Sequence, residues 1–435
     1  MKKIFLLLVL FFSIFSLFGC KNSSEKYQYK AAFDKVSYKY EDVKEEEYLN
    51  FSNKVNIFSS QITELIYENN DQKNFVISPI SIYMALAMAV ESSDGSTQKE
   101  ILEALGLSYE EVSKYTKILY SLCNKEYTTE NFLGKEKVVA ESILTNSIWI
   151  DNDIELIKNG MEKLAENYNT DSYRVPFKDS ISKANKAIND YINDKTKGLI
   201  DSLPNLDEET LMVLLNTFYF KEIWNDDGDE LKLTSQKYDF TSSSDVVKKV
   251  FLLMGKYVNG KAYEDEKYTH FFTTTEHNYK ISFIVPKENY GVKDIFLSEN
   301  LVKIINMKDY KQVDEEKKEQ NFTRCFFPEY EAEFDGDIKN ELEKMGISRL
   351  FTPDCSFGNI TNEWIYCNRI IHKTKLKVDR TGILGASITA LEMPGAADPG
   401  EYKKVYYDYI VDRSFGFLIT NPNGVVIFSG VINDI

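Results

Sequence analysis

Residues 74–90 of the chain read NFVISPISIYMALAMAV. From Ile80 to Val90 this segment is apolar on every side, which predicts a helix buried inside the protein. Ser78-Pro79 marks its start, since proline is tolerated in the first turn of a helix. The chain has 435 residues, enough to build a sizeable core around such a helix without disulfides or metals.

Helical patterns also flank this segment. Residues 49–68 place one apolar face on a helix, formed by Val55, Phe58, Ile62, Leu65 and Ile66. After the central segment, Thr97 and Glu100 match a capping box, and Gly106 marks the end of the helix that this box would begin. The first third of the chain is therefore expected to be largely helical.

Strand patterns dominate the later part. Residues 142–150 and the continuously apolar residues 211–220 predict strands, the second buried on both faces, and residues 184–194 predict a helix between them. Residues 370–379 alternate, with His372 and Val378 on one face and lysines on the other. Two apolar runs joined by residues 421–424 predict a hairpin at the C-terminus. The fold class is therefore mixed α/β.

The composition excludes several classes of protein. Hydrophobic residues make up 43% and aromatic residues 14%, which excludes intrinsic disorder. Five cysteines are too few for a disulfide scaffold. The formal net charge of −16 argues against a nucleic-acid binder, because such proteins need a basic surface.

The N-terminal residues are expected to form an export signal. Lys2 and Lys3 precede a short apolar run that ends in Gly19-Cys20 and resembles a bacterial lipoprotein cleavage box. We expect a signal peptide at 1–19, a lipidated Cys20 and flexible tether at 20–48, and the folded domain at 49–435. A plain secretion signal and an uncleaved anchor helix are the alternatives. The protein is expected to be lipid-anchored at the cell envelope or cell surface. Release into the extracellular space is the alternative.

Sequence patterns of known catalytic and metal sites are absent. No HExxH, P-loop, GxGxxG or GxSxG occurs, and no metal or cofactor is expected. Ser96 to Lys99 fits SxxK, which leaves a lipoprotein hydrolase as a weak alternative. Four cysteines follow Cys20, and their spacing matches no zinc site. Export permits disulfides, but we expect mostly buried free thiols at Cys123, Cys325, Cys355 and Cys367.

Several long motifs, in order, resemble the serpin family. They cover nearly the whole body from about residue 49. The motifs are residues 74–107, TNSIWI at 145–150, INDYINDKTKGLI at 188–200, LLNTFYFKEIW at 214–224, residues 326–351, IIHKTKLKVDRTG at 370–382, and the runs at 412–419 and 425–432. Such a series is far more specific than any single short motif.

This resemblance implies a fold with three β-sheets, several helices and an exposed reactive loop at about 380–408. In that family a target protease cuts the loop, which then inserts into the main sheet and carries the acylated protease with it. The resemblance therefore implies that the protein is not an enzyme. It implies a monomeric suicide-substrate inhibitor whose targets are serine proteases or, as a second possibility, cysteine proteases. A non-inhibitory serpin, acting as a binding or decoy module, is the alternative.

The loop composition suits insertion. Residues 381–391 carry no charge and no proline, as a segment that becomes a central strand requires. The hinge implied by the resemblance comprises Gly382, Ile383, Gly385, Ala386 and Ser387. Two residues depart from the family pattern. Ile383 replaces the usual Thr or Ser, and Arg380 replaces the usual acid.

The resemblance also places the remaining functional residues. The family spacing from Gly382 puts the reactive bond at Ala396–Ala397, which suggests an elastase-like target; Lys403 and Lys404 would suit a trypsin-like one. A polar cluster beneath the main sheet is expected from Ser78, Ser81, Asn216 and His372. Trp224 is expected at the top of the sheet, where insertion begins.

Overall fold

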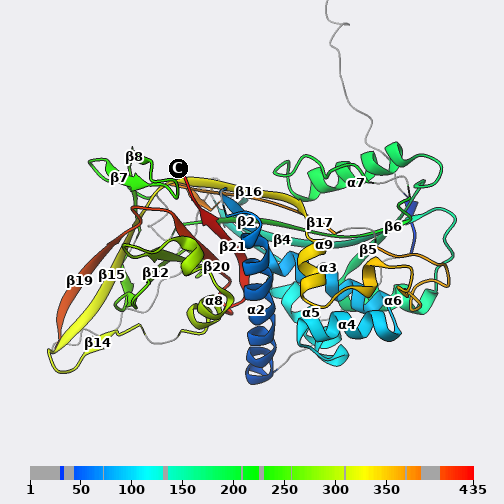
Figure 1. Ribbon diagram of the computed structural model, residues 1–435, viewed down its shortest axis with the longest axis horizontal. Helices are drawn as coiled ribbons and strands as arrows, with labels where there is room; N and C mark the ends of the chain where they lie inside the picture. The colour runs from blue at the N-terminus through cyan, green and yellow to red at the C-terminus, as the bar shows by residue number, and fades with distance from the viewer. Residues whose placement is uncertain are drawn as a thin grey trace, which may run out of the picture.

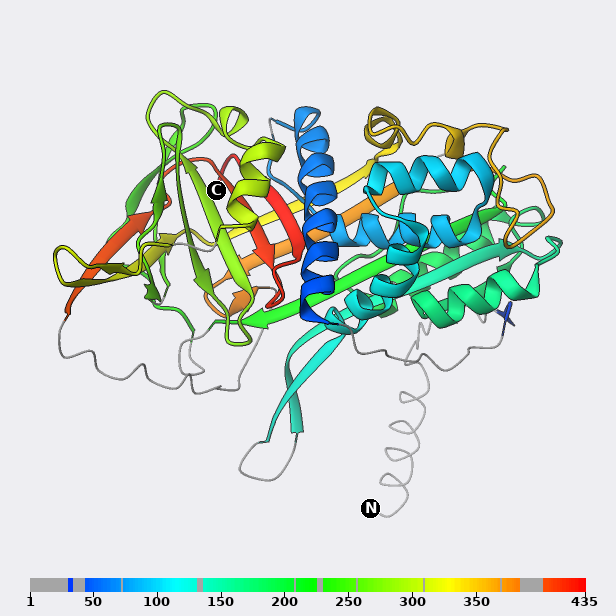
Figure 2. The ribbon, with the colours of Figure 1, turned by 90° about the horizontal axis from the view of Figure 1, so that it is seen from below.

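The computed structural model describes residues 30–33, 44–71, 73–130, 136–206, 209–224, 230–255, 257–307, 310–367, 370–383 and 402–435. The organising element is an eight-stranded sheet with the order β1-β5-β4-β6-β18-β17-β16, in which β3 also pairs with β4. Its strands are β1 (Lys30–Ala31), β3 (Lys125–Glu130), β4 (Glu136–Asp151), β5 (Thr170–Val175), β6 (Met212–Ile223), β16 (Tyr330–Asp337), β17 (Ile371–Asp379) and β18 (Gly382–Ile383). In Figure 2, β16 (yellow), β17 (orange) and β6 (green) cross the molecule one after another.

The predicted buried helix is α3, and it lies against the inner face of this sheet. The bundle around it contains α2 (Glu45–Glu68), α3 (Pro79–Ser92), α4 (Gly95–Leu105), α5 (Tyr109–Leu122) and α6 (Lys158–Tyr168). Helix α7 (Ile181–Lys195) covers the opposite face (Figure 1). Trp149 of β4 and Tyr191 of α7 pack against each other in a separate apolar cluster between the helix and the sheet. Helices therefore cover both faces of the sheet here, but Met212, Val213 and Leu214 at the start of β6 are only partly buried, so the burial predicted for the apolar run at 211–220 is incomplete.

Two further sheets form the other end of the molecule, together with a two-stranded ribbon. The six-stranded sheet contains β2 (Phe75–Ile77), β11 (Tyr263–Glu264), β12 (Tyr268–Thr274), β13 (Lys280–Pro286), β20 (Phe415–Thr420) and β21 (Val426–Ile432). The five-stranded sheet contains β9 (Leu253–Met254), β10 (Val258–Asn259), β14 (Val313–Asp314), β15 (Glu319–Phe327) and β19 (Lys403–Ile410), and the ribbon contains β7 (Tyr238–Thr241) and β8 (Val247–Val250). The shorter helices are η2 (Val292–Asp294), α8 (Ser298–Ile305), α9 (Lys339–Lys344) and η3 (Arg349–Phe351). The predicted C-terminal hairpin is β20–β21.

Two local expectations differ from the structure. Helix α2 begins at Glu45, so the expected domain boundary at 48 lies inside it, and Lys30–Ala31 adds an edge strand to β5 within the expected tether. Thr97 does not cap a helix, because α4 begins at Gly95 with Asp94 as its N-cap residue. The Thr97 hydroxyl instead accepts a hydrogen bond from the backbone N–H of Ser356 at 3.0 Å.

The four cysteines of the body are free thiols, three of them buried and Cys367 partly exposed. Within the described ranges, no group of three or more His, Cys, Asp or Glu side chains is arranged to hold a metal ion. The helices in those ranges include none long and apolar enough to span a bilayer.

Candidate functional site

The candidate site is the place where the main sheet is interrupted between β6 and β17. The two residues of β18 fill only one end of this opening. Gly382 pairs with Asp379 of β17 and Ile223 of β6, and Ile383 pairs with Val378 and Glu222. Along the rest of β6 and β17, no described strand lies between them. Their facing edges therefore carry backbone groups available to a further strand.

Close packing at the filled end explains the glycine and accommodates the isoleucine. A Cβ atom on Gly382 would lie 2.1 Å from the carbonyl oxygen of Glu222, so only glycine fits there. Ile383 is fully buried in the apolar core. An apolar side chain thus suits this position, although the family usually carries a hydroxyl residue there.

Trp224 lies at the end of the opening that β18 fills. Its indole Nε1–H donates a hydrogen bond to the backbone carbonyl of Asp379 at 2.7 Å, and its ring is buried against Phe327. The tryptophan thereby ties the end of β6 to the end of β17 at the point where the loop segment begins.

Arg380 has a partner that the sequence analysis did not identify. Its Nε atom lies 3.3 Å from Oε1 of Glu329, and its backbone N–H donates to the same oxygen at 3.1 Å. Glu329 sits directly before β16. Arg380 is therefore paired with an acidic residue that directly precedes β16.

The predicted polar cluster lies beneath the opening. The Ser81 hydroxyl donates to Oδ1 of Asn216, which joins α3 to β6. Nε2 of His372 accepts from the backbone N–H of Ser78 at 3.1 Å and lies 2.7 Å from the Thr374 hydroxyl. Burial lowers the pKa of His372 to about 3, so this imidazole is neutral and acts as an acceptor. All four predicted residues thus join α3 to the two strands that flank the opening.

A second buried group was missed by the sequence analysis. Nδ1 of His277 lies 2.8 Å from Oε1 of Glu222, whose backbone pairs with Ile383. The Tyr127 ring stacks on His277 with 3.6 Å between the ring centroids. Burial raises the pKa of Glu222. No local pattern marks these residues, because they come from three elements far apart in the sequence.

Several predicted residues lie outside the described ranges. They are Cys20, Gly385, Ala386, Ser387, Ala396 and Ala397. By contrast, Lys403 and Lys404 belong to β19, where they pair with Glu319 and Gln320 of β15. The expected loop boundary at 408 is therefore too late, since regular strand pairing starts at Lys403.

The SxxK pattern forms no catalytic group. Ser96, the serine of the pattern, is exposed on α4, and Lys99 is exposed and pairs with Glu103 on the same helix at 3.5 Å. The lysine is therefore paired with a carboxylate rather than placed as the base of a serine nucleophile.

Comparisons with known proteins agree with this geometry. The family profile described as "Serpin (serine protease inhibitor)" matches residues 53–435. The chain is 24% identical to pig (Sus scrofa) plasminogen activator inhibitor 1 over 397 residues, covering 86% of this chain and 90% of that protein. It is 25% identical to human (Homo sapiens) corticosteroid-binding globulin over 334 residues, covering 75% of this chain and 78% of that protein.

Among solved structures, the native state of the thermophilic serpin tengpin superposes with a TM-score of 0.70 at 24% identity, covering 94% of this chain and 100% of tengpin. Such a likeness establishes the fold. The family profile covers most of the chain and describes inhibitors of serine proteases rather than enzymes. The chain therefore belongs to the serpin family of serine protease inhibitors.

Proposed function

We propose that this protein is a suicide-substrate inhibitor whose loop, once cut by a serine protease, inserts from Gly382 onward between β6 and β17. The observation that carries the proposal is β18, because its two residues already pair with both flanking strands. The remaining edges of these strands are complementary to an antiparallel strand that continues in the same register.

Extending that register gives the expected partners of the loop. Each step forward along the loop is one step back along β17 and along β6. Ser387 then falls between Thr374 and Phe218, and Thr389 falls between His372 and Asn216. The hydroxyl of Thr389 would thus arrive at the polar cluster, where hydrogen-bonding partners are available.

The length of the proline-free segment also fits the opening. In the extended register Pro394 falls opposite Leu211, one residue before β6 begins at Met212. A proline cannot donate to a β-ladder, so it is tolerated only at such an end. The chain can therefore supply a full-length inserted strand without placing proline inside it.

We assign the reactive bond to Ala396–Ala397 and the target to proteases with an elastase-like preference for small side chains. Lys403 and Lys404 are poorer candidates for the bond, because they are held in the β15–β19 ladder. A protease needs an extended, accessible segment, and a strand within a sheet is not one.

The same proposal includes a surface tether through a lipidated Cys20. It rests on the basic start, the apolar run and the Gly19-Cys20 box of the sequence. Cys20→Ser should remove a metabolically incorporated lipid label and leave either a released protein or an unprocessed precursor. Retention of the label on the Cys20→Ser variant would contradict this assignment.

Inhibition is tested by incubating the protein with a panel of serine and cysteine proteases, followed by a denaturing gel. A band at the summed mass that survives denaturant is the expected result, and a catalytically inactive protease variant is the control. Cleavage of the loop by every active protease without such a band would instead favour a binding role, as the name of corticosteroid-binding globulin describes for that relative.

A further inference from the structure

One face of the five-stranded sheet carries aromatic side chains in ordered rows. Its central strand, β15, pairs with β10 on one edge and runs parallel to β19 on the other. Figure 1 shows β15 and β19 side by side at one end of the molecule. Paired residues on neighbouring strands point to the same side of a sheet, so each row belongs to one face. We name six residues the aromatic face: Asn259, Phe322 and Tyr406 in one row, and Tyr257, Arg324 and Asp408 in the next.

The side chains of the aromatic face contact one another. The Phe322 ring stacks on Tyr406 with 5.4 Å between the ring centroids, and the Tyr257 ring meets Tyr406 edge-on at 4.7 Å. The guanidinium carbon of Arg324 lies 4.9 Å from the centroid of the Tyr257 ring, and its Nη2 atom lies 2.9 Å from Oδ2 of Asp408. The charged pair is thus satisfied within the face, and the rings are held in place before any partner arrives.

The aromatic face points to solvent. Tyr406 is 53% exposed and Tyr257 is 40% exposed, whereas Asn321, Thr323 and Cys325, the alternate residues of β15, are buried on the opposite side. A group of exposed aromatic side chains around an arginine has the composition of the centre of a protein–protein interface. Contiguous exposed apolar surface of this kind marks an interaction site more often than a structural one.

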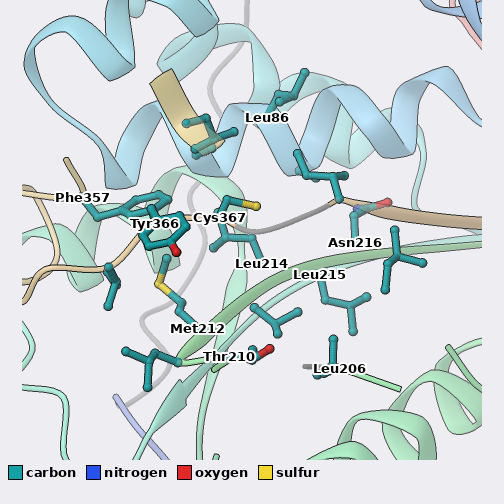
Figure 3. A pocket seen from close by; sticks show the side chains of 18 of the residues that line it. Leu86, Leu206, Thr210, Met212, Leu214, Leu215, Asn216, Phe357, Tyr366 and Cys367 are labelled. Carbon is teal, nitrogen blue, oxygen red and sulfur yellow. The ribbon is translucent and has the colours of Figure 1, made fainter. Parts of the chain in front are cut away.

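Two other exposed aromatic side chains belong to the opening in the main sheet. Trp364 and Tyr366 border a cavity of about 290 Å³ between α3 and the start of β6. Figure 3 shows Tyr366 there, close to Phe357 and Cys367. The proposed function already uses this opening. The aromatic face is separate from it, because its strands belong to a different sheet.

The chain length between the proposed reactive bond and β19 identifies the occupant of the face. Five residues separate Ala397 from Tyr402, so these two positions lie at most about 18 Å apart. Strand β19 begins one residue later, and Tyr406 follows Lys403 after about 10 Å of strand. A compact domain of about 200 residues has a radius of gyration of about 16 Å. A protease bound at the reactive bond is therefore large enough and near enough to reach the aromatic face.

We propose that the aromatic face is a second contact surface for the target protease, and that it binds an apolar surface beside the protease's active-site cleft. The inference rests on the proposed function and adds a part of the partner's surface. Cleavage at Ala396–Ala397 separates the inserting segment from β19, and the acylated protease stays with the inserting segment. The face therefore stabilises the complex that forms before cleavage, and it sets the rate of inhibition rather than the outcome of insertion.

The test uses the protease that forms the denaturant-stable band in the panel described above. Tyr406→Ala and Tyr257→Ala should each lower the second-order rate constant of inhibition by about tenfold, the effect of truncating a central interface tyrosine. The Kd for the same protease with its nucleophilic serine replaced by alanine should rise by a similar factor. The number of inhibitor molecules consumed per trapped protease, and the gain in Tm on nicking, should keep their wild-type values.

Ile57→Ala is the matched control, because Ile57 is 44% exposed on α2, outside the aromatic face. An unchanged rate constant in both tyrosine variants, or an equal loss in Ile57→Ala, would overturn the inference while leaving the proposed function intact. A slower reaction with higher inhibitor consumption or a smaller gain in Tm would also overturn it, because the substitution would then act on insertion.

Two further outcomes complete the test. Sedimentation velocity on the intact wild type should show a monomer. A dimer that Tyr406→Ala converts to monomer would make the aromatic face a surface for self-association and overturn its assignment to the protease. If no protease in the panel forms the denaturant-stable band, the proposed function fails and this inference fails with it.

Discussion

Nε2 of His372 accepts a hydrogen bond from the backbone N–H of Ser78 at 3.1 Å, across 294 residues of sequence. This bond fixes the start of β17 to the first turn of α3. The Ser81–Asn216 bond fixes β6 to the same helix. The two strands that flank the opening are thus each attached to α3, while their facing edges stay available for a further strand.

His372→Ala should destabilise the protein. The substitution leaves the Ser78 N–H and the Thr374 hydroxyl buried without their acceptor, at about 1–3 kcal/mol for an unsatisfied group. Urea unfolding should show the loss, and size-exclusion chromatography should show more oligomer as the strands separate. A variant with unchanged unfolding free energy and an unchanged elution volume would contradict the role assigned to this histidine.

The stability of the protein should fall as the pH drops from about 6.5 toward 3. Burial lowers the pKa of His372, and of His270, to about 3. In that pH range the unfolded chain binds protons that the folded chain does not, so acid favours unfolding. His372→Gln should reduce the slope of unfolding free energy against pH by up to about 1.4 kcal/mol per pH unit. Parallel curves for the two proteins would exclude a neutral buried His372.

Arg380→Glu should lower the free energy of unfolding, because it removes the ion pair at the start of the loop segment. It places a carboxylate beside that of Glu329, where an ion pair now lies. Both side chains are about 40% exposed, so the expected loss is modest, about 0.2–1 kcal/mol. The exchanged double variant Arg380→Glu/Glu329→Arg should recover most of it. A double-mutant cycle by urea unfolding measures this, and additive losses would show that the pair is not coupled.

Ser387→Glu should convert the inhibitor into a substrate. The register places Ser387 on the inward face between Thr374 and Phe218, where a charge has no partner and costs several kcal/mol. Leu384→Glu is the matched control, because Leu384 falls on the outward face between Lys377 and Lys221. The stoichiometry of inhibition should rise for Ser387→Glu alone. A similar rise for both variants would contradict the register.

Much of the fold could be predicted from the sequence, because its signals are local. The apolar run at 80–90 predicts α3, and the alternation at 370–379 predicts β17 with its buried His372 face. The family resemblance then identified the four polar residues beneath the opening. For the helix and the strand, a pattern within a few residues corresponds to one buried face, whereas the polar residues come from segments up to 294 residues apart.

The rest depends on contacts between distant segments. Two such contacts are the pair Arg380–Glu329 and the pair Glu222–His277. The spacing of these residues in the sequence does not indicate that they meet in the folded protein. The Thr97 capping box failed for a related reason. Its hydroxyl accepts from the backbone at Ser356, so a tertiary contact takes precedence over the local motif.

The most direct test of insertion is a melting curve of the wild-type protein before and after limited proteolysis in the loop, with the cut site identified by mass spectrometry. A new strand between β6 and β17 adds a ladder on both of its edges, so the nicked protein should melt at a clearly higher temperature than the intact one. An intact and a nicked protein that melt at the same temperature would contradict insertion, and with it the inhibitory mechanism.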